Sequence, residues 1–179
     1  MKDKYIVLIV GESGSGKSTI CNELTTRYGL KQVESYTTRP MRYEGESGHI
    51  FVNDVEFDAL DNMCAYTMFN GYKYGATQEQ VDNADLYVID LDGIDYFMAH
   101  YSGRKIPMVV YIKTPIYTRV KRMLKRGDTE DKIIERLSYD YVHFSGAIDY
   151  AIYTYDNDDG VHNISAISYD IYDKFFSEW

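Results

Sequence analysis

The chain has 179 residues, of which 45% are hydrophobic and 15% aromatic, and its formal net charge is -9 at pH 7. This length and apolar fraction suit one globular domain with a single core. An acidic surface repels phosphate backbones and anionic headgroups, which argues against general nucleic-acid or membrane-surface binding. The longest apolar runs, at 5–10 and 107–112, are too short to span a bilayer. With no leader-like segment at the start of the sequence, we expect a cytoplasmic protein.

The first predicted element is the run YIVLIV at 5–10, which is apolar and rich in β-branched side chains. Such a run is typical of a parallel strand that is buried on both faces. It is followed at once by GESGSGKST at 11–19 and by a helical pattern over 17–28. This is the phosphate-loop motif G-x-x-x-x-G-K-[ST] in the strand-loop-helix context that the motif requires.

The physics of this loop favours the binding of an anion. Its glycines let the backbone curl so that successive N–H groups converge, and the helix start adds unpaired donors and partial positive charge. Lys17 is placed to reach the β and γ phosphates, and the Ser18 hydroxyl to ligate Mg²⁺. The residues expected to hold the nucleotide are Gly11, Ser13, Gly14, Ser15, Gly16, Lys17, Ser18 and Thr19.

Residues 35–84 interrupt the alternation of strands and helices. Short strand-like pieces at 49–52, 64–69 and 72–77 surround a helix-like segment at 54–61, and FNGYKYG has the composition of a hairpin turn. We therefore expect an inserted subdomain. It opens on SYTTRPMR, which places Arg39 and Arg42 three residues apart on a predicted loop.

The remaining sequence returns to the alternating pattern. Strands are predicted at 86–90, 107–112 and 150–155, and helices at 93–101, 115–126, 131–143 and 162–177. This order predicts an α/β fold with a right-handed parallel sheet flanked by helices.

The strand at 86–90 ends in Asp90, at the sheet edge where the phosphate loop is also expected. Asp90, or Asp92 two residues later, would orient Mg²⁺-bound water there. A structural role is equally open to Asp92, because DGIDYF has the composition of a helix start that this residue would cap.

Positive charge is concentrated in one segment. Residues 104–136 contain ten Lys or Arg and four acids, a local balance of 10 - 4 = +6. Paired charges on solvated helix faces explain several of them. A cationic segment in an acidic protein also suggests an anionic ligand that is held locally.

The two cysteines, Cys21 and Cys64, lie in helix-like and strand-like sequence without the spacing of metal ligands. We expect buried free thiols instead of a disulfide. No internal repeat or Pro-rich linker divides the chain, which favours a single domain.

Several segments together resemble the guanylate kinase family of nucleoside monophosphate kinases. In chain order they are GESGSGKST, SYTTRPMR with a following GE and G-x-x-FV, YKYGAT, VIDLD, RMLKRGD with Arg136 behind it, and DNDD at 156–159. The resemblance implies a phosphate-loop NTPase fold with ATP and Mg²⁺ as co-substrate and cofactor. It further implies a core at 1–34, 85–125 and 140–179, an insert for the acceptor nucleotide at about 35–84, and a helical lid at about 126–139.

The resemblance also implies individual roles. Arg39 and Arg42 would clamp the acceptor's phosphate, and planar guanidinium groups suit phosphate oxygens. The other residues implied on the acceptor side are Ser35, His49, Tyr74 and Asp92. Those implied on the donor side are the lid arginines Arg122, Arg126 and Arg136, which with Lys17 stabilise the transferred phosphoryl group, and Asn157 beside the adenine.

Base recognition departs from the family pattern at two positions. Ala65 stands where the family has a glutamate that reads guanine, and Ala76 where it usually has serine or threonine. Guanine presents two donors that a carboxylate pairs well, and a site without that partner discriminates differently. Nearby polar residues that could substitute are Thr67, Thr77 and Gln78.

The resulting hypothesis is transfer of the γ-phosphoryl group of ATP to GMP or dGMP. A kinase of another nucleotide or small phosphorylated metabolite remains an alternative, because fold alone does not exclude it. A non-catalytic binding module for phosphorylated peptides is disfavoured by the intact Gly16, Lys17, Ser18, Arg126 and Arg136. A third alternative is a nucleotide-binding protein that hydrolyses ATP and has no acceptor for the phosphoryl group. The oligomeric state is left open.

Overall fold

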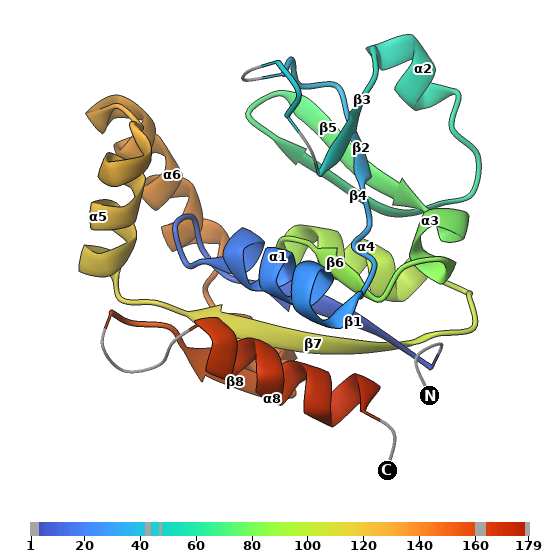
Figure 1. The fold of residues 1–179 in the computed structure, drawn as a ribbon. Coiled ribbons are helices and arrows are strands. Elements are labelled where there is room, and N and C mark those ends of the chain that lie inside the picture. The colour runs from blue at the N-terminus through green and yellow to red at the C-terminus, as the bar shows by residue number, and fades with distance from the viewer. Residues whose placement is uncertain (1–3, 42–43, 47, 160–163, 178–179) are drawn as a thin grey trace.

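The computed structural model describes residues 4–41, 44–46, 48–159 and 164–177. Arg42, one half of the predicted acceptor clamp, lies outside these residues, as does the start of the helix predicted from 162. A parallel sheet lies between two layers of helices, and a second sheet stands to one side of it (Figure 1). The predicted α/β phosphate-loop architecture is confirmed.

The central sheet has the strand order β6-β1-β7-β8, and all of its strands are parallel. Its strands are β1 (Tyr5–Val10), β6 (Leu86–Val88), β7 (Ile106–Lys113) and β8 (Tyr153–Asp156). Five successive residues of β1 are fully buried because helices cover both faces of the sheet. Since β1 and β6 are parallel neighbours, their carboxyl ends meet at one edge, which brings the phosphate loop and Asp90 together.

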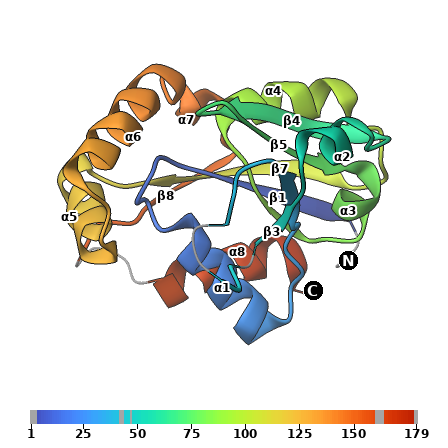
Figure 2. The ribbon, with the colours of Figure 1, turned by 90° about the horizontal axis from the view of Figure 1, so that it is seen from above.

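Helices cover the two faces of this sheet unequally (Figure 2). One face carries α1 (Lys17–Tyr28) and α8 (Ile164–Phe176), which bury Ile20, Leu24 and Ile171 against it. The other carries α4 (Leu91–His100) and the short α7 (Ala147–Tyr150). The remaining long helices, α5 (Ile116–Arg126) and α6 (Glu130–His143), stand together beyond the end of the sheet (Figure 1).

The insert forms a sheet of its own with the strand order β3-β2-β5-β4. Its elements are β2 (Ser35–Thr37), β3 (His49–Phe51), α2 (Asp54–Asp58), β4 (Met63–Phe69), β5 (Tyr72–Thr77) and α3 (Gln78–Asp82). The predicted hairpin is confirmed: β4 and β5 are antiparallel and are joined by Asn70 and Gly71, with φ of 52° and 77°. Two successive positive φ values are typical of a type I′ turn, which matches the twist of a hairpin. β4 packs against α4, so the insert rests on the central domain.

The structure corrects the predicted start of α4. The carboxylate of Asp90 accepts the Gly93 N–H at 2.7 Å and caps the helix, which therefore begins at Leu91 and not at 93. Asp90, and not Asp92, has the capping role. Cys21 and Cys64 are buried and free, as predicted. Within the described part of the chain, no helix has the length and apolarity needed to cross a membrane.

Candidate functional site

The phosphate loop leaves the start of α1 open to an anion. Its N-cap residue, Gly16, has φ 99° and ψ 11°, no side chain caps the helix, and its first turn contains no acid. Unpaired N–H groups at such a start are a ready anion site. Glycine is also required sterically, because a Cβ on Gly16 would lie 2.5 Å from Nδ2 of Asn157, and one on Gly14 would lie 2.8 Å from the Arg119 carbonyl oxygen.

Lys17 is folded back onto the loop. Its ammonium group donates hydrogen bonds to the carbonyl oxygens of Gly11 and, at 3.0 Å, Glu12. Burial lowers the pKa of Lys17 to about 8, although the negative charges of Asp140 and Glu12 oppose this change. A phosphate that reached this position would replace weak carbonyl partners by a strong anionic one.

Two residues predicted to act on the donor side, Asn157 and Arg122, contact the loop backbone. The carbonyl oxygen of Ser15 accepts hydrogen bonds from Asn157 Nδ2 at 2.7 Å, Thr114 Oγ1 at 3.1 Å and Arg122 at 3.3 Å. Asn157 is buried, and its side-chain amide is engaged in this contact. A contact between Asn157 and the adenine therefore stays a prediction, while its contact with the loop is a feature of the structure.

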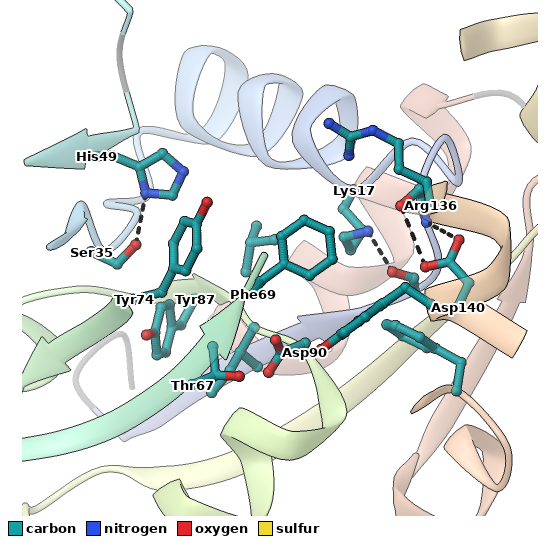
Figure 3. Close-up of a pocket in the computed structure, with 16 residues that line it drawn as sticks. Lys17, Ser35, His49, Thr67, Phe69, Tyr74, Tyr87, Asp90, Arg136 and Asp140 are labelled. Atoms are coloured by element: carbon teal, nitrogen blue, oxygen red, sulfur yellow. Dashed lines mark hydrogen bonds between the residues drawn. The ribbon is translucent and has the colours of Figure 1, made fainter. Parts of the chain in front are cut away.

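The other two arginines predicted for the lid contact one acid. Arg126 donates to both carboxylate oxygens of Asp128, and Nε of Arg136 lies 3.7 Å from the same carboxylate. Asp128 lies between α5 and α6, so it links an arginine from the end of the first helix to one on the second. Arg136 lies on the same side of the cavity as Lys17, across from His49 and Tyr74 (Figure 3).

Acceptor-side residues lie across the cavity from the loop (Figure 3). Ser35 Oγ and His49 Nδ1 are 2.9 Å apart, and the His49 ring meets the Tyr74 ring edge-on at 5.7 Å between centroids. These three residues and Lys17 line one cavity of about 230 Å³. A wider cleft of about 1280 Å³ adjoins it, with Ser18, Arg126 and Arg136 among its lining residues.

Arg39 has a different environment from the one that the clamp prediction suggests. Its guanidinium group is paired with both carboxylate oxygens of Glu46, at 2.9 and 3.1 Å, and also donates to the Pro40 carbonyl at 2.8 Å. The pKa of Arg39 is raised: burial opposes the charge, but Glu46 and Tyr74 outweigh it. Arg39 lines neither of these two cavities, and its role as a clamp remains a prediction.

The two predicted acids separate in space. Asp90 lines the cavity and caps α4; burial raises its pKa, and the Gly93 N–H and the Thr67 hydroxyl oppose this change. Asp92 is exposed and turned toward α6, where its carboxylate lies 2.7 Å from His143 Nδ1 and accepts a hydrogen bond from the Tyr139 hydroxyl at 3.4 Å.

Of the three polar residues expected near the base of the acceptor, one lines the cavity. Ala65 and Ala76 face each other across β4 and β5 and are fully buried. Thr67, two residues along β4, lines the cavity opposite Tyr74, its cross-strand partner. The other candidates are engaged elsewhere: Thr77 caps α3, and Gln78 accepts a hydrogen bond from Ser102.

Sequence reasoning missed several residues of this site. Phe69, Tyr87 and Tyr139 form aromatic walls of the cavity, and Asp140 on α6 reaches the phosphate loop. The aromatic side chains carried no signal beyond ordinary core patterning. Asp140 lies four residues after Arg136, and this spacing places the two on one face of a helix. This spacing was the one feature of the sequence that could have identified Asp140 as a residue of the site.

Comparisons with known proteins find relatives of this chain by sequence and by structure. A family model described as "AAA domain" matches residues 7–143. The chain is 31% identical to a guanylate kinase of Thermobifida fusca over 146 residues, which are 74% of this chain and 73% of that protein. It is 26% identical to a guanylate kinase of Clostridium tetani over 181 residues, which are 93% of this chain and 86% of that protein.

A solved structure of similar fold is the guanylate kinase from Anaplasma phagocytophilum. The TM-score is 0.61 at 22% sequence identity, and the match covers 97% of this chain and 86% of that one. This likeness supports the fold, and the sequence matches carry the family assignment. With its phosphate loop, insert and arginine-bearing helices in the order that the resemblance implied, the chain belongs to the guanylate kinase family of phosphate-loop proteins.

Proposed function

We propose that this protein transfers the γ-phosphoryl group of ATP to GMP or dGMP. Membership in the guanylate kinase family makes it an ATP-dependent phosphotransferase, and its acceptor a nucleoside monophosphate. The observation that carries the proposal is one shared cavity: Lys17 lies on one side of it, and Ser35, His49 and Tyr74 lie on the other.

Transfer requires no covalent intermediate on the protein. An oxygen of the acceptor phosphate attacks the γ-phosphorus in line, a new P–O bond forms, and the bond between the γ-phosphorus and the β–γ bridging oxygen breaks to release ADP. A phosphate dianion is already nucleophilic, so no general base is needed. Catalysis then consists of positioning and charge stabilisation.

Charge stabilisation falls to the cations around the cavity. Lys17 contacts the β and γ phosphates from the loop, and Arg126 and Arg136 approach the migrating group from α5 and α6. Arg122 acts mainly by holding the loop backbone and the Asn157 carbonyl at 3.0 Å. Arg39 and Arg42 bind the acceptor's phosphate, together with His49 and Tyr74. Closure of the insert (about 35–84) and the lid (about 126–139) excludes the water that would otherwise hydrolyse ATP.

Mg²⁺ fits the donor set of the site. Ser18 offers an exposed hydroxyl at the start of α1, and Asp90 offers a carboxylate at the same sheet edge. Within the described residues, no group of three or more His, Cys, Asp or Glu side chains could hold a metal. One or two oxygen ligands suit Mg²⁺, which is typically bound with substrate phosphates and water. When bound, it would neutralise charge on the β and γ phosphates.

Guanine recognition would have to use other groups than the family's glutamate. The cavity offers the hydroxyls of Ser35, Thr67 and Tyr87 for this purpose. Each hydroxyl oxygen can accept a hydrogen bond from one of the two donors of guanine. The lack of a carboxylate at position 65 and of a hydroxyl at position 76 supports the second candidate, a kinase of another nucleotide or small phosphorylated metabolite.

A coupled assay that follows ADP release separates these candidates. The purified protein is given Mg-ATP and, in turn, GMP, dGMP, AMP, CMP, UMP, IMP and a sugar phosphate. The proposal predicts the highest kcat/KM for GMP or dGMP. A higher value for another acceptor would replace guanine by that acceptor, and no turnover of any nucleoside monophosphate would refute the proposed function.

A further inference from the structure

We propose that Asp140 is a positioning residue that ties α6 to the phosphate loop and thereby holds Arg136 over the transferred phosphoryl group. The proposal rests on the proposed function, because Arg136 has this target only in a phosphoryl-transfer site. Asp140 is 5% exposed, and the loop is 127 residues away in sequence.

The anchor consists of three hydrogen bonds to one buried carboxylate. Asp140 accepts the Ser13 N–H at 3.0 Å and the Ser13 hydroxyl at 3.3 Å, and Arg119 donates to it at 2.9 Å (Figure 3 shows the bonds to Ser13). Charge-assisted hydrogen bonds of this kind are about twice as strong as neutral ones. They join α6, the phosphate loop and α5 at a single point.

Arg119 adds a second contact between α5 and the loop. Its backbone packs so closely on Gly14 that a Cβ there would lie 2.8 Å from the Arg119 carbonyl oxygen. Both side chains of this ion pair are buried: that of Arg119 is 9% exposed and that of Asp140 is 5% exposed. A movement of α6 away from the loop would therefore leave two buried charges without their partners, which is costly.

Helical geometry fixes the position of Arg136 relative to Asp140. Residues four apart on a helix lie on one face, about 5–6 Å between their Cβ atoms. Arg136 and Asp140 both line the cavity on the side of Lys17 (Figure 3), and Asp140 is bound to the loop. The position of Asp140 thus sets how far Arg136 stands from the donor phosphates.

A carboxylate beside a phosphate site has an electrostatic cost that needs an explanation. Asp140 lies near enough to Lys17 to oppose the loss of its charge, and it repels an incoming phosphate. A residue that served packing alone would not need a charge here. A positioning role explains why the charge lies against the loop, since only a hydrogen-bond acceptor can engage the Ser13 N–H and the Arg119 guanidinium together.

The test is a double-mutant cycle on turnover with Asp140→Asn, Arg136→Ala and the double variant. Asp140→Asn should lower kcat by about 10- to 100-fold, the loss expected from a displacement of about 1 Å, while the acceptor's KM changes less than about two-fold. If Asp140 acts through Arg136, the double variant should be no worse than Arg136→Ala within about two-fold. The proposal would be overturned if the loss of kcat in the double variant equalled the product of the losses in the two single variants. An unchanged kcat in Asp140→Asn would also overturn it.

Asp131→Asn is the matched control, because Asp131 is an exposed acid on the same helix. Its kcat should equal that of the unmodified protein. If Asp140→Asn does not fold, Asp140→Glu keeps the charge and displaces it by one methylene. It should retain the melting temperature and still lose kcat, and full activity in this variant would count against the proposal.

Hydrogen exchange keeps this inference separate from the proposed function. Amides of 130–143 should exchange faster in Asp140→Asn than in Asp131→Asn, whether or not any acceptor is turned over. An unmodified protein that phosphorylates no monophosphate would refute the proposed function. Unchanged exchange over 130–143 would refute the anchor.

Discussion

Arg39 and Glu46 form a buried ion pair in which both carboxylate oxygens accept from the guanidinium group, at 2.9 and 3.1 Å. Their side chains are 9% and 5% exposed. The residue that the sequence assigned to an incoming phosphate is thus already paired within the protein.

Removal of one partner of this pair should be strongly destabilising. Arg39→Ala leaves Glu46 charged and buried, and we expect the free energy of unfolding in urea to fall by about 3–5 kcal/mol. Arg27→Ala is the control, because Arg27 and Glu23 form an exposed pair, for which about 1 kcal/mol or less is expected. Equal losses in the two variants would show that the Arg39 pair has no special energetic role.

ATP binding should take up a proton at alkaline pH. Burial lowers the pKa of Lys17 to about 8 in the nucleotide-free protein, and nearby phosphate would restore the charged form. Calorimetry in buffers of different ionisation enthalpy should find nearly one proton taken up at pH 9 and almost none at pH 6.5. Affinity should weaken above pH 8 by up to about tenfold per pH unit. If the heat of ATP binding at pH 9 were the same in every buffer, no proton would be taken up and the prediction would be wrong.

The lowered pKa of Lys17 should also make the stability of the nucleotide-free protein depend on pH. The folded protein releases the Lys17 proton at about pH 8, while the unfolded chain keeps it up to its ordinary value of 10.5. The unfolded state therefore binds more protons between these pH values, and this group's contribution to stability should rise with pH across that window. Lys17→Met, followed by urea unfolding at pH 7.5 and 9.5, should lack this part of the pH dependence.

Thr67 should contribute to acceptor binding with little effect on the chemical step. Thr67→Val keeps the shape of the side chain and removes a hydroxyl that lines the cavity and could bond the acceptor. Loss of a hydrogen bond worth about 1 kcal/mol predicts a rise in acceptor KM of about five-fold, with kcat preserved. Thr154→Val on the exposed strand β8 is the control. A fall in kcat at constant KM would place Thr67 in the transfer step instead.

The hairpin of the insert meets α6 through an aromatic pair. The rings of Phe69 and Tyr139 are edge-on at 4.6 Å between centroids, and Asn70 donates to Glu135 at 2.7 Å beside them. Tyr139→Ala should admit water and raise ATP hydrolysis without acceptor relative to transfer. Because such a pair is worth about 0.5–1.5 kcal/mol, we expect a change of about 2- to 10-fold. Tyr139→Phe keeps the ring and should behave as the unmodified protein; an equal change in both variants would assign the effect to the hydroxyl.

Sequence patterns predicted the long elements well and the short ones poorly. β1, α1, β7, α5 and α6 lie within a residue or so of their predicted bounds, because their periodicity or buried run is long. The short α3 and α7 were missed, since a segment of four or five residues has too few positions to display a period. The start of α4 was misplaced because two aspartates, Asp90 and Asp92, were both plausible caps, and local sequence does not rank them.

The sequence by itself determined the phosphate loop and the family, because nine contiguous residues after a buried strand carry the whole anion-binding geometry in their own backbone. Only the tertiary structure decided which charges meet. Ser13 and Asp140 lie 127 residues apart, Arg39 is paired with Glu46, and Asp92 is turned toward α6 while Asp90 enters the cavity. These pairings depend on how strands and helices pack, and a charge acquires its role in the site from the partners that packing brings within reach.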